Sequence, residues 1–301
     1  MEFNKKPLNT AEMVQRLILR GMNIRDNSAT EHALNHINYY RLSPYWRIFE
    51  IDRSGANHSF HPGTDFDCVL RYYAFDQELR QLLMGEIDKI EISLRRSWAG
   101  HLATNYGPFA NQEASLFTNK SEWRSSLAIL MKDYDRSNEL FAKHYLDNYE
   151  NLKLPPIWVC AELMSFGTLS KLISNLANPK DRQEISQPYN LDEVVLVSFL
   201  HHLVSVRNTV AHHSRIWNRK FVLRFKLPQN KSIGLLPFFA YGEDDVKRIY
   251  NTLVMIGYMA NAISSTSRFH VKLVELISTY PEINTASMGF PANWKEMPIW
   301  N

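Results

Sequence analysis

The chain has 301 residues, of which 45% are hydrophobic and 22% are charged. This composition is that of an ordinary globular protein and excludes a disordered chain as the default. The 11 Gly and 13 Pro are few for this length, which excludes a turn-rich all-β protein and favours long helices. The two cysteines, Cys68 and Cys160, lie too far apart for a metal-binding knuckle, and we expect two buried thiols in a reducing cytosol.

Neither a signal peptide nor a membrane span is predicted. Residues 1–10 contain two lysines and a proline in place of the apolar core of a signal peptide. The most apolar stretch, residues 194–206, is interrupted by His201 and His202 and is shorter than the roughly 18 residues that a membrane span needs. We therefore expect a cytoplasmic protein with no membrane partner.

Hydrophobic periodicity in the first third predicts helices. Residues 10–19 and 30–37 have helical patterns, with Ser28 as a possible N-cap of the second. An aromatic segment, residues 38–46, and a loop rich in Gly, Asn and His, residues 52–63, follow. Residues 65–105 then form one long predicted helix, because apolar residues recur at three-to-four spacing. These residues are Leu79, Leu82, Leu83, Ile87, Ile90 and Leu94.

The rest of the chain predicts further helices and at most one short strand. Alternation over residues 221–225 is typical of a strand, and the tail 288–301, rich in Trp and Pro, is expected to be extended. We expect one compact unit made of an N-terminal helical and aromatic segment (1–63), a helical core (64–280) and a C-terminal tail (281–301). The predicted helices are residues 122–135, one beginning near Trp158, 169–176, 191–216, 244–263 and 269–278.

A basic window separates Glu193 from Glu243. The 49 positions between them contain no Asp or Glu, although 31 acids in 301 residues would place about five there on average. The same window holds seven Lys or Arg residues and four His residues. This distribution predicts a positive surface that binds anions, with RNA or DNA phosphates the commonest large anion. A basic surface with no partner is the alternative.

Several catalytic motifs are absent. The chain has no GxGxxG, GxxxxGK[ST], HExxH or GxSxG motif, so nucleotide-loop, zinc-protease and α/β-hydrolase functions have no support. The four His of the basic window have no Asp, Glu or Cys nearby, and adjacent His side chains point about 100° apart on a helix. We expect neither a metal nor another cofactor.

The spacing Arg-x4-His is not informative by itself. With 11 His in 301 residues, about 0.7 such pairs are expected by chance, so the context must decide. One pair lies in the loop 52–63, one at the end of the long helix, and one inside the basic window. In that order they are Arg53/His58, Arg96/His101 and Arg207/His212.

The helix that carries the third pair is amphipathic. At 100° per residue, a polar stripe forms on one side, and an apolar group that faces the core forms on the other. A His in line with Asn and two Arg is a better candidate site than an isolated His. The stripe consists of His201, Asn208, His212, Arg215 and Arg219, and the apolar group of Phe199, Leu203, Val206, Val210 and Trp217.

Arg207 does not lie on this stripe, because it falls roughly 140° from His212 on an ideal helix. Its long side chain would have to reach round the helix, the helix would have to be distorted, or Arg207 would act with a second subunit. Alternatively, Arg207 forms a structural ion pair with an acid of the long helix, such as Glu91.

The segment 206–219, VRNTVAHHSRIWNR, resembles the signature of the Abi_2 (AbiD/AbiF-like) abortive-infection proteins, within the HEPN superfamily. Other blocks resemble the family in the same order along nearly the whole chain, which is more specific than one short motif. These blocks are residues 38–46, 75–80, 90–95, 156–158, 165–170 and 288–291.

The resemblance implies a mainly α fold: a HEPN-like helical bundle with additional N- and C-terminal helices. It also implies metal-independent RNA cleavage, a homodimer in which two Arg-x4–6-His motifs line one cleft, and a role in phage defence or toxin-like control. A structured partner RNA is a further expectation. Because the superfamily includes members that bind without cutting, the alternative is a non-catalytic RNA-binding or protein-interaction module.

The roles of individual residues follow from this resemblance. His212 is expected to act as a general base or acid on a 2′-OH, since imidazole titrates near neutral pH. Arg207 is expected to stabilise charge on the phosphorane oxygens, and Asn208 to orient His212 or hold substrate. The expected RNA-binding residues are His213, Arg215, Arg219 and Lys220, and the expected supporting residues are Glu91, Arg95 and Tyr40.

The aromatic segment 38–46 allows two interpretations. Tyr39, Tyr40, Tyr45 and Trp46 have the side chains on which single-stranded bases stack. Aromatic residues in such a block are more often part of a hydrophobic core. The sequence leaves both interpretations open.

Overall fold

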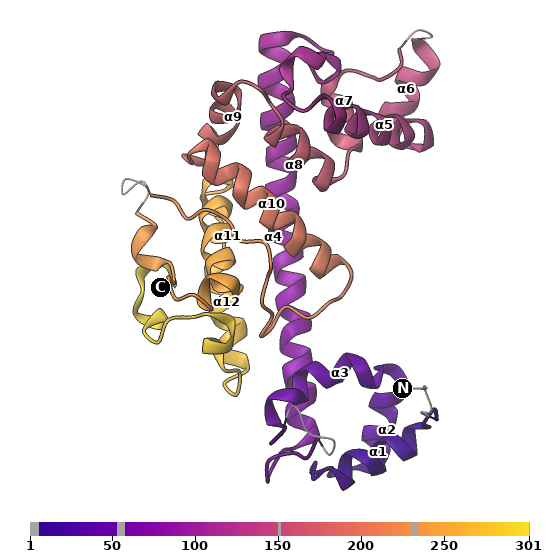
Figure 1. Ribbon diagram of the computed structural model, residues 1–301, viewed down its shortest axis with the longest axis vertical. Coiled ribbons are helices and arrows are strands. Elements are labelled where there is room, and N and C mark those ends of the chain that lie inside the picture. Colours follow the sequence, from indigo (N-terminus) through magenta and orange to yellow (C-terminus); the bar gives the residue numbers. More distant parts are fainter. Residues whose placement is uncertain (1–5, 53–57, 150–151, 230–233, 301) are drawn as a thin grey trace. The chain divides into compact units, whose positions relative to one another are not determined.

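The computed structural model describes residues 6–52, 58–149, 152–229 and 234–300. These residues form α-helices joined by turns and short 3-10 segments, and no β-strand occurs among them (Figure 1). Three isolated bridge pairs are the only β-type pairings in the same ranges. The prediction of a mainly α fold is confirmed.

The chain forms two compact units. Unit 1 consists of Met1–Leu79 with Glu275–Ile283, and unit 2 of Arg80–Val274 with Asn284–Asn301. Two helices contribute to both units: α4 (Phe66–Tyr106) and α12 (Phe269–Thr279). The segments 1–63, 64–280 and 281–301 expected from the sequence stay a prediction.

Unit 1 contains three short helices and the beginning of α4. The expected N-cap Ser28 is wrong, because the carboxylate of Asp26 accepts the Ala29 N–H at 3.0 Å and the helix begins at Asn27. The aromatic segment is itself a helix, with Pro44 inside it. The helices are α1 (Thr10–Leu19), α2 (Asn27–His36) and α3 (Tyr39–Trp46).

The aromatic residues of α3 divide between core and surface. Tyr45 and Trp46 are buried, and the Tyr45 hydroxyl donates to Asp76 at 2.6 Å. Tyr40, in contrast, is 76% exposed. Base stacking is therefore excluded for Tyr45 and Trp46, which belong to the hydrophobic core of unit 1.

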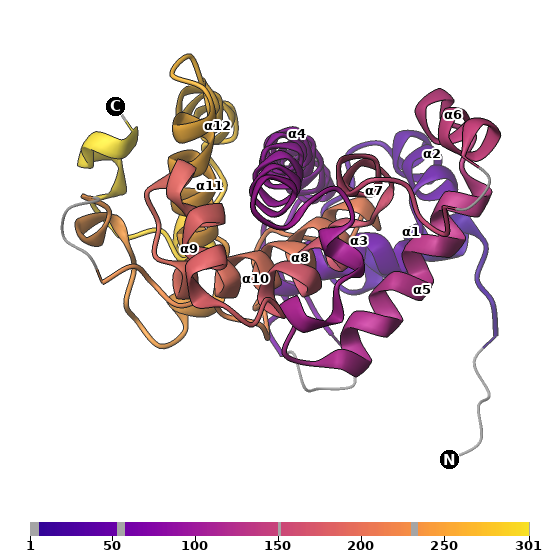
Figure 2. The same ribbon diagram turned by 90° about the horizontal axis from the view of Figure 1, so that it is seen from above.

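Unit 2 contains the remaining helices and the larger hydrophobic core. The sequence analysis does not predict two of them, α6 and α9, which are both short; α6 is also mostly exposed. Helix α10 lies beside α8 in both views (Figures 1 and 2). The helices are α5 (Lys120–Arg136), α6 (Leu140–Asn148), α7 (Ile157–Leu163), α8 (Phe166–Ser174), α9 (Pro179–Ser186), α10 (Glu193–Ala211) and α11 (Tyr250–Ile263).

Two segments of unit 2 do not have the conformation that the sequence predicts. Residues 221–225 are not a strand, because their backbone groups bond outside any sheet: the Phe221 N–H donates to the Lys247 carbonyl at 2.7 Å. The expected extended tail instead folds into short 3-10 turns, Thr285–Met288, Trp294–Glu296 and Pro298–Trp300, which bury Met288 and Trp300. Asn301 lies outside the described residues.

Helix α10 is unusually apolar. By length and composition it is the one described helix that could cross a membrane: over its most apolar 18 residues the mean hydropathy is 1.4. Half of these 18 residues are buried inside the protein. Its apolar side, Phe199, Leu203, Val206 and Val210, is at most 3% exposed, which confirms the predicted core-facing group together with the buried Trp217.

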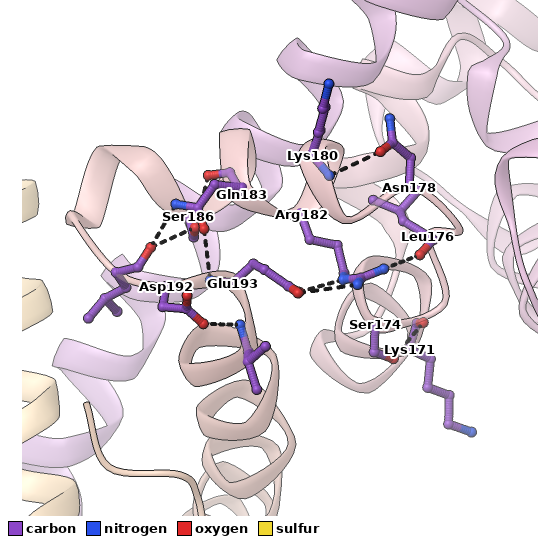
Figure 3. A network of polar contacts seen from close by, with 12 residues as sticks. Lys171, Ser174, Leu176, Asn178, Lys180, Arg182, Gln183, Ser186, Asp192 and Glu193 are labelled. Carbon is purple, nitrogen blue, oxygen red and sulfur yellow. Dashed lines mark hydrogen bonds and ion pairs between the residues drawn. The ribbon is translucent and has the colours of Figure 1, made fainter. Parts of the chain in front are cut away.

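A polar network joins the beginning of α10 to α9 (Figure 3). The Arg182 guanidinium donates to both carboxylate oxygens of Glu193, at 2.6 and 3.3 Å, and to the Leu176 carbonyl just after α8. The Gln183 side chain accepts the Glu193 N–H at 3.1 Å, and Asp192 caps the helix. This network therefore ties α10 to the C-terminal end of α8.

Candidate functional site

The C-terminal end of α10 shapes the site. The helix ends at Ala211, where the chain turns through His213 with a φ of 55°. The His213 N–H donates to the Val210 carbonyl at 2.9 Å, and the Ser214 N–H donates to the Thr209 carbonyl at 2.9 Å. This pair of bonds is a Schellman motif, in which His213 occupies the left-handed position that usually holds glycine.

The early end of α10 corrects one expectation. The sequence predicted a helix to residue 216, so that Arg215 and Arg219 would continue the polar stripe by periodicity. Both residues lie after the helix, and the turn at His213 places them. Arg219 still joins the site described next, whereas Arg215 is not among the residues that line it.

An open pocket of about 510 Å³ runs along the polar side of α10. Three residues of the predicted stripe, His201, Asn208 and His212, line it together with Arg219 from the following segment. None of the described residues that line this pocket is Asp or Glu, so its formal charge is positive. The remaining lining residues are Gly167, Ser170, Lys171, Val204, Ser205, Thr209, Ser214 and Leu223.

His212 and Asn208 have side chains available to a ligand. Both residues are exposed, and neither side chain has a hydrogen bond to another described residue. The expected hydrogen bond by which Asn208 would orient His212 is therefore not formed among these residues. In this arrangement the imidazole and the amide are both free to bind substrate within the same pocket.

Arg207 is directed away from this pocket. Its Nε lies 4.0 Å from the Glu91 carboxylate on α4, and Arg207 is not among the residues that line the pocket. Arg95 binds the other oxygen of Glu91 and donates to two carbonyls at the end of α7, Ala161 at 2.6 Å and Glu162 at 2.8 Å. The structure thus contains the Arg207–Glu91 ion pair that the helical geometry offered as one alternative.

The two adjacent histidines of α10 have different environments. His201 is exposed and lines the pocket, and its Nδ1 lies 3.4 Å from the Ser170 hydroxyl of α8. His202 is buried: Nδ1 donates to the Leu223 carbonyl at 2.7 Å, and Nε2 accepts from the Thr252 hydroxyl at 2.7 Å. Burial lowers the pKa of His202 to about 4, so its imidazole is neutral and structural.

Of the other expected RNA-binding residues, only some line the pocket. The Arg219 guanidinium lies over the Phe221 ring, 5.8 Å from its centroid, and still lines the pocket. Lys220 forms an exposed ion pair with Asp244 at 2.8 Å, which lowers the pKa of Asp244. His213 is exposed at the turn.

Sequence reasoning missed the contribution of α8 to the site. Gly167, Ser170 and Lys171 recur at the spacing of one helix face and form one wall of the pocket. Residues 165–170 belong to a block that resembles the Abi_2 family, but no pattern in the sequence pairs this face with α10. Only the packing of α8 against α10 shows the pairing.

Tyr40 belongs to a separate pocket within unit 1. This pocket has a volume of about 760 Å³ and is lined by Tyr39 and Tyr40 of α3, Arg16 of α1 and Lys6, among others.

The other two Arg-x4-His pairs lie outside the α10 pocket. The pair Arg53/His58 lies partly outside the described residues. In the pair Arg96/His101, His101 binds the buried Asp181 at 2.9 Å, a contact that joins α4 to α9.

No group of three or more His, Cys, Asp or Glu residues that could hold a metal ion occurs in the described ranges. The two thiols, Cys68 and Cys160, are unpaired. Cys160 is buried, and burial raises its pKa to about 12, so it is protonated at neutral pH and a poor nucleophile.

Comparisons with known proteins assign a family. A family model for Abi-like proteins matches residues 32–218, well over half of the chain. The match includes α3 to α10 and every described residue that lines the α10 pocket except Arg219 and Leu223. No curated protein and no solved structure gives a significant match. The chain therefore belongs to the family of Abi-like proteins.

Proposed function

We propose that this protein is a metal-independent endoribonuclease of the HEPN type, and that it acts in the bacterial cytoplasm in abortive infection or toxin-like control. Membership of the Abi-like family suggests abortive infection. The observation that carries the proposal is the pocket along α10. It brings together His212, Asn208 and Arg219; the first two have no side-chain hydrogen bond to another described residue, and no described residue that lines the pocket is Asp or Glu.

The proposed reaction is cleavage by the 2′-OH of the RNA itself. The His212 imidazole accepts the proton of a ribose 2′-OH while this oxygen attacks the adjacent phosphorus. The bond from phosphorus to the 5′ oxygen breaks, and that oxygen takes a proton from a second imidazole or from water. The products are a 2′,3′-cyclic phosphate and a 5′-OH, with no change of oxidation state. Arg219 binds the charged phosphate, and Asn208 holds substrate.

Arg207 enters this proposal through a second protomer. Within one chain it is paired with Glu91 and does not line the pocket that contains His212. In a homodimer, each Arg207 would stabilise the phosphorane at a cleft shared by two copies of the motif. The Arg207 side chain is 38% exposed, so it is accessible to a partner.

The same ion pair favours a second candidate function, a non-catalytic RNA-binding or protein-interaction module. If Glu91 holds Arg207 permanently, the basic pocket would still bind phosphates but would lack the cation expected at the reaction centre. The two functions share salt-dependent RNA binding, so a binding assay does not distinguish them.

RNA cleavage in EDTA separates the two functions. Total bacterial RNA is incubated with the wild type, with His212→Ala and with His144→Ala, which removes an exposed histidine of α6. All three should first show matching thermal unfolding. The nuclease predicts cleavage by the wild type and His144→Ala and none by His212→Ala. RNA binding without cleavage by any of the three would support the module, and equal cleavage by all three would contradict the assignment of His212.

A further inference from the structure

The pocket extends well beyond His212. His201 and His212 both line it, and eleven residues of helix at ~1.5 Å per residue place their backbones about 16 Å apart along the axis of α10. The pocket is therefore a groove that is longer than the reaction centre alone requires. A substrate that enters it has a second place of contact at the His201 end.

The His201 end has its own set of polar groups. Ser170 is a buried residue of α8, and its hydroxyl lies 3.4 Å from His201 Nδ1, which holds one nitrogen of the ring. Lys171 follows on the same helix; it is exposed, lines the groove, and has no ion pair to another described residue. Leu223, 47% exposed, adds an apolar surface at this end.

We propose that Lys171 and His201 form a phosphate subsite that binds the same single-stranded RNA some nucleotides away from the bond cut at His212. This inference rests on the proposed function, because the distance is counted from the reaction centre. Lys171 is the cation of the subsite, and the His201 ring donates to a phosphate oxygen. Leu223 contacts the sugar that precedes this phosphate.

A single strand fits the groove better than a duplex does. A volume of about 510 Å³ is that of a site for a small ligand, and α8 and α10 pack directly against each other along its floor. A short strand can lie along such a groove with its bases turned outward, whereas an A-form duplex offers a wide, shallow face. The 2′-OH attack also needs a strand free to bend, which pairing restricts.

The test uses Lys171→Ala, Lys171→Arg and the control Lys180→Ala. Lys180 is an exposed lysine of the neighbouring helix α9 that does not line the groove, and its side chain extends away from Lys171 (Figure 3). Affinity is measured with single-stranded oligonucleotides of two, four, six and eight nucleotides that carry 2′-O-methyl groups, which block cleavage. A matching eight-base-pair duplex completes the set.

Affinity of the wild type should rise with length up to the point where the strand reaches Lys171. Lys171→Ala should then bind the longer strands about tenfold more weakly than the wild type does, because it lacks one charged phosphate contact. Dinucleotide binding should not change, Lys171→Arg should restore most of the affinity, and Lys180→Ala should match the wild type. Equal effects of Lys171→Ala and Lys180→Ala at every length, or duplex binding as tight as that of the single strand, would overturn the subsite.

The failure of this inference differs from failure of the proposed function. Binding of uncleavable strands reports on the subsite whether or not the protein cuts RNA. If Lys171→Ala has the length-dependent effect but the wild type never cleaves unmodified RNA, the subsite is supported and the nuclease function is contradicted. If the wild type cleaves through His212 but Lys171→Ala has no effect, the nuclease function is supported and the subsite is contradicted.

Discussion

The buried imidazole of His202 makes the stability of the fold depend on pH. Its pKa is lowered from 6.5 to about 4, chiefly by burial, so the unfolded chain binds a proton there before the folded chain does. The neutral His202 ring therefore contributes fully to the free energy of unfolding above pH 6.5, and this contribution is lost as the pH falls toward 4. Relative to pH 7.5, the loss amounts to about 2 kcal/mol at about pH 5 and about 3 kcal/mol at about pH 4.

The perturbation is His202→Gln, which removes the titrating ring, and the control is His201→Gln, which changes the exposed neighbour. Free energies of unfolding are measured in urea by circular dichroism at pH 7.5 and at pH 5. His202→Gln is expected to be less stable than the wild type at pH 7.5, because it replaces the two hydrogen bonds to Leu223 and Thr252 imperfectly. The difference should shrink by about 2 kcal/mol at about pH 5. A difference that is the same at both pH values would show that His202 does not titrate on unfolding, and a His201→Gln control that behaves like His202→Gln would show that the effect is not specific to the buried ring.

Three further predictions concern stability and reactivity. Arg182→Ala should lower the free energy of unfolding by about 2 kcal/mol, because it breaks a bidentate, mostly buried pair with Glu193, whereas Lys180→Ala should change it by less than about 0.5 kcal/mol in the same urea titration. His213→Gly should leave the fold intact and raise the melting temperature slightly, since glycine adopts a φ of 55° without strain; a lower melting temperature would show that the His213 side chain contributes more than the strain costs. Cys160 should react with iodoacetamide at neutral pH only after unfolding, because its thiol is buried with a pKa of about 12; mass spectrometry that finds rapid labelling of Cys160 in the native protein would contradict its burial.

Elements with a strong apolar period could be predicted from the sequence. The long helix predicted at 65–105 is α4, Phe66–Tyr106, because its buried positions recur at three-to-four spacing along ten turns. Helix α6 was missed because it has almost no buried face: Ala142 is buried, whereas Leu140 is 85% exposed. A short helix without an apolar stripe carries no periodic signal.

Two predictions, the end of α10 and the strand at residues 221–225, are wrong because the glycine that usually ends a helix and the sheet that usually pairs a strand are both absent there. The end of α10 was placed too late because His213, and not a glycine, takes the left-handed position that stops the helix. The segment 221–225 alternates like a strand because Phe221 is buried and Val222 is 95% exposed. An extended segment that packs singly against helices gives the same alternation without a sheet.

The candidate site was partly predictable. The angle between Arg207 and His212 on an ideal helix already indicated that they diverge, and the structure pairs Arg207 with Glu91 at 4.0 Å. The grouping of His201, Asn208 and His212 on one side of α10 also followed from helical geometry. The contribution of Lys171 could not be predicted, because it depends on the packing of α8 against α10, which no single-helix pattern encodes.

The chemistry of the product ends shows whether His212 performs metal-independent cleavage. A defined single-stranded RNA is incubated in EDTA with wild type and with His212→Ala, and the new ends are mapped by ligation that distinguishes a 2′,3′-cyclic phosphate from a 3′-OH. Cleavage by 2′-OH attack at His212 should give 2′,3′-cyclic phosphate and 5′-OH ends with the wild type and no new ends with His212→Ala. New 3′-OH ends, or the same ends with both proteins, would contradict it.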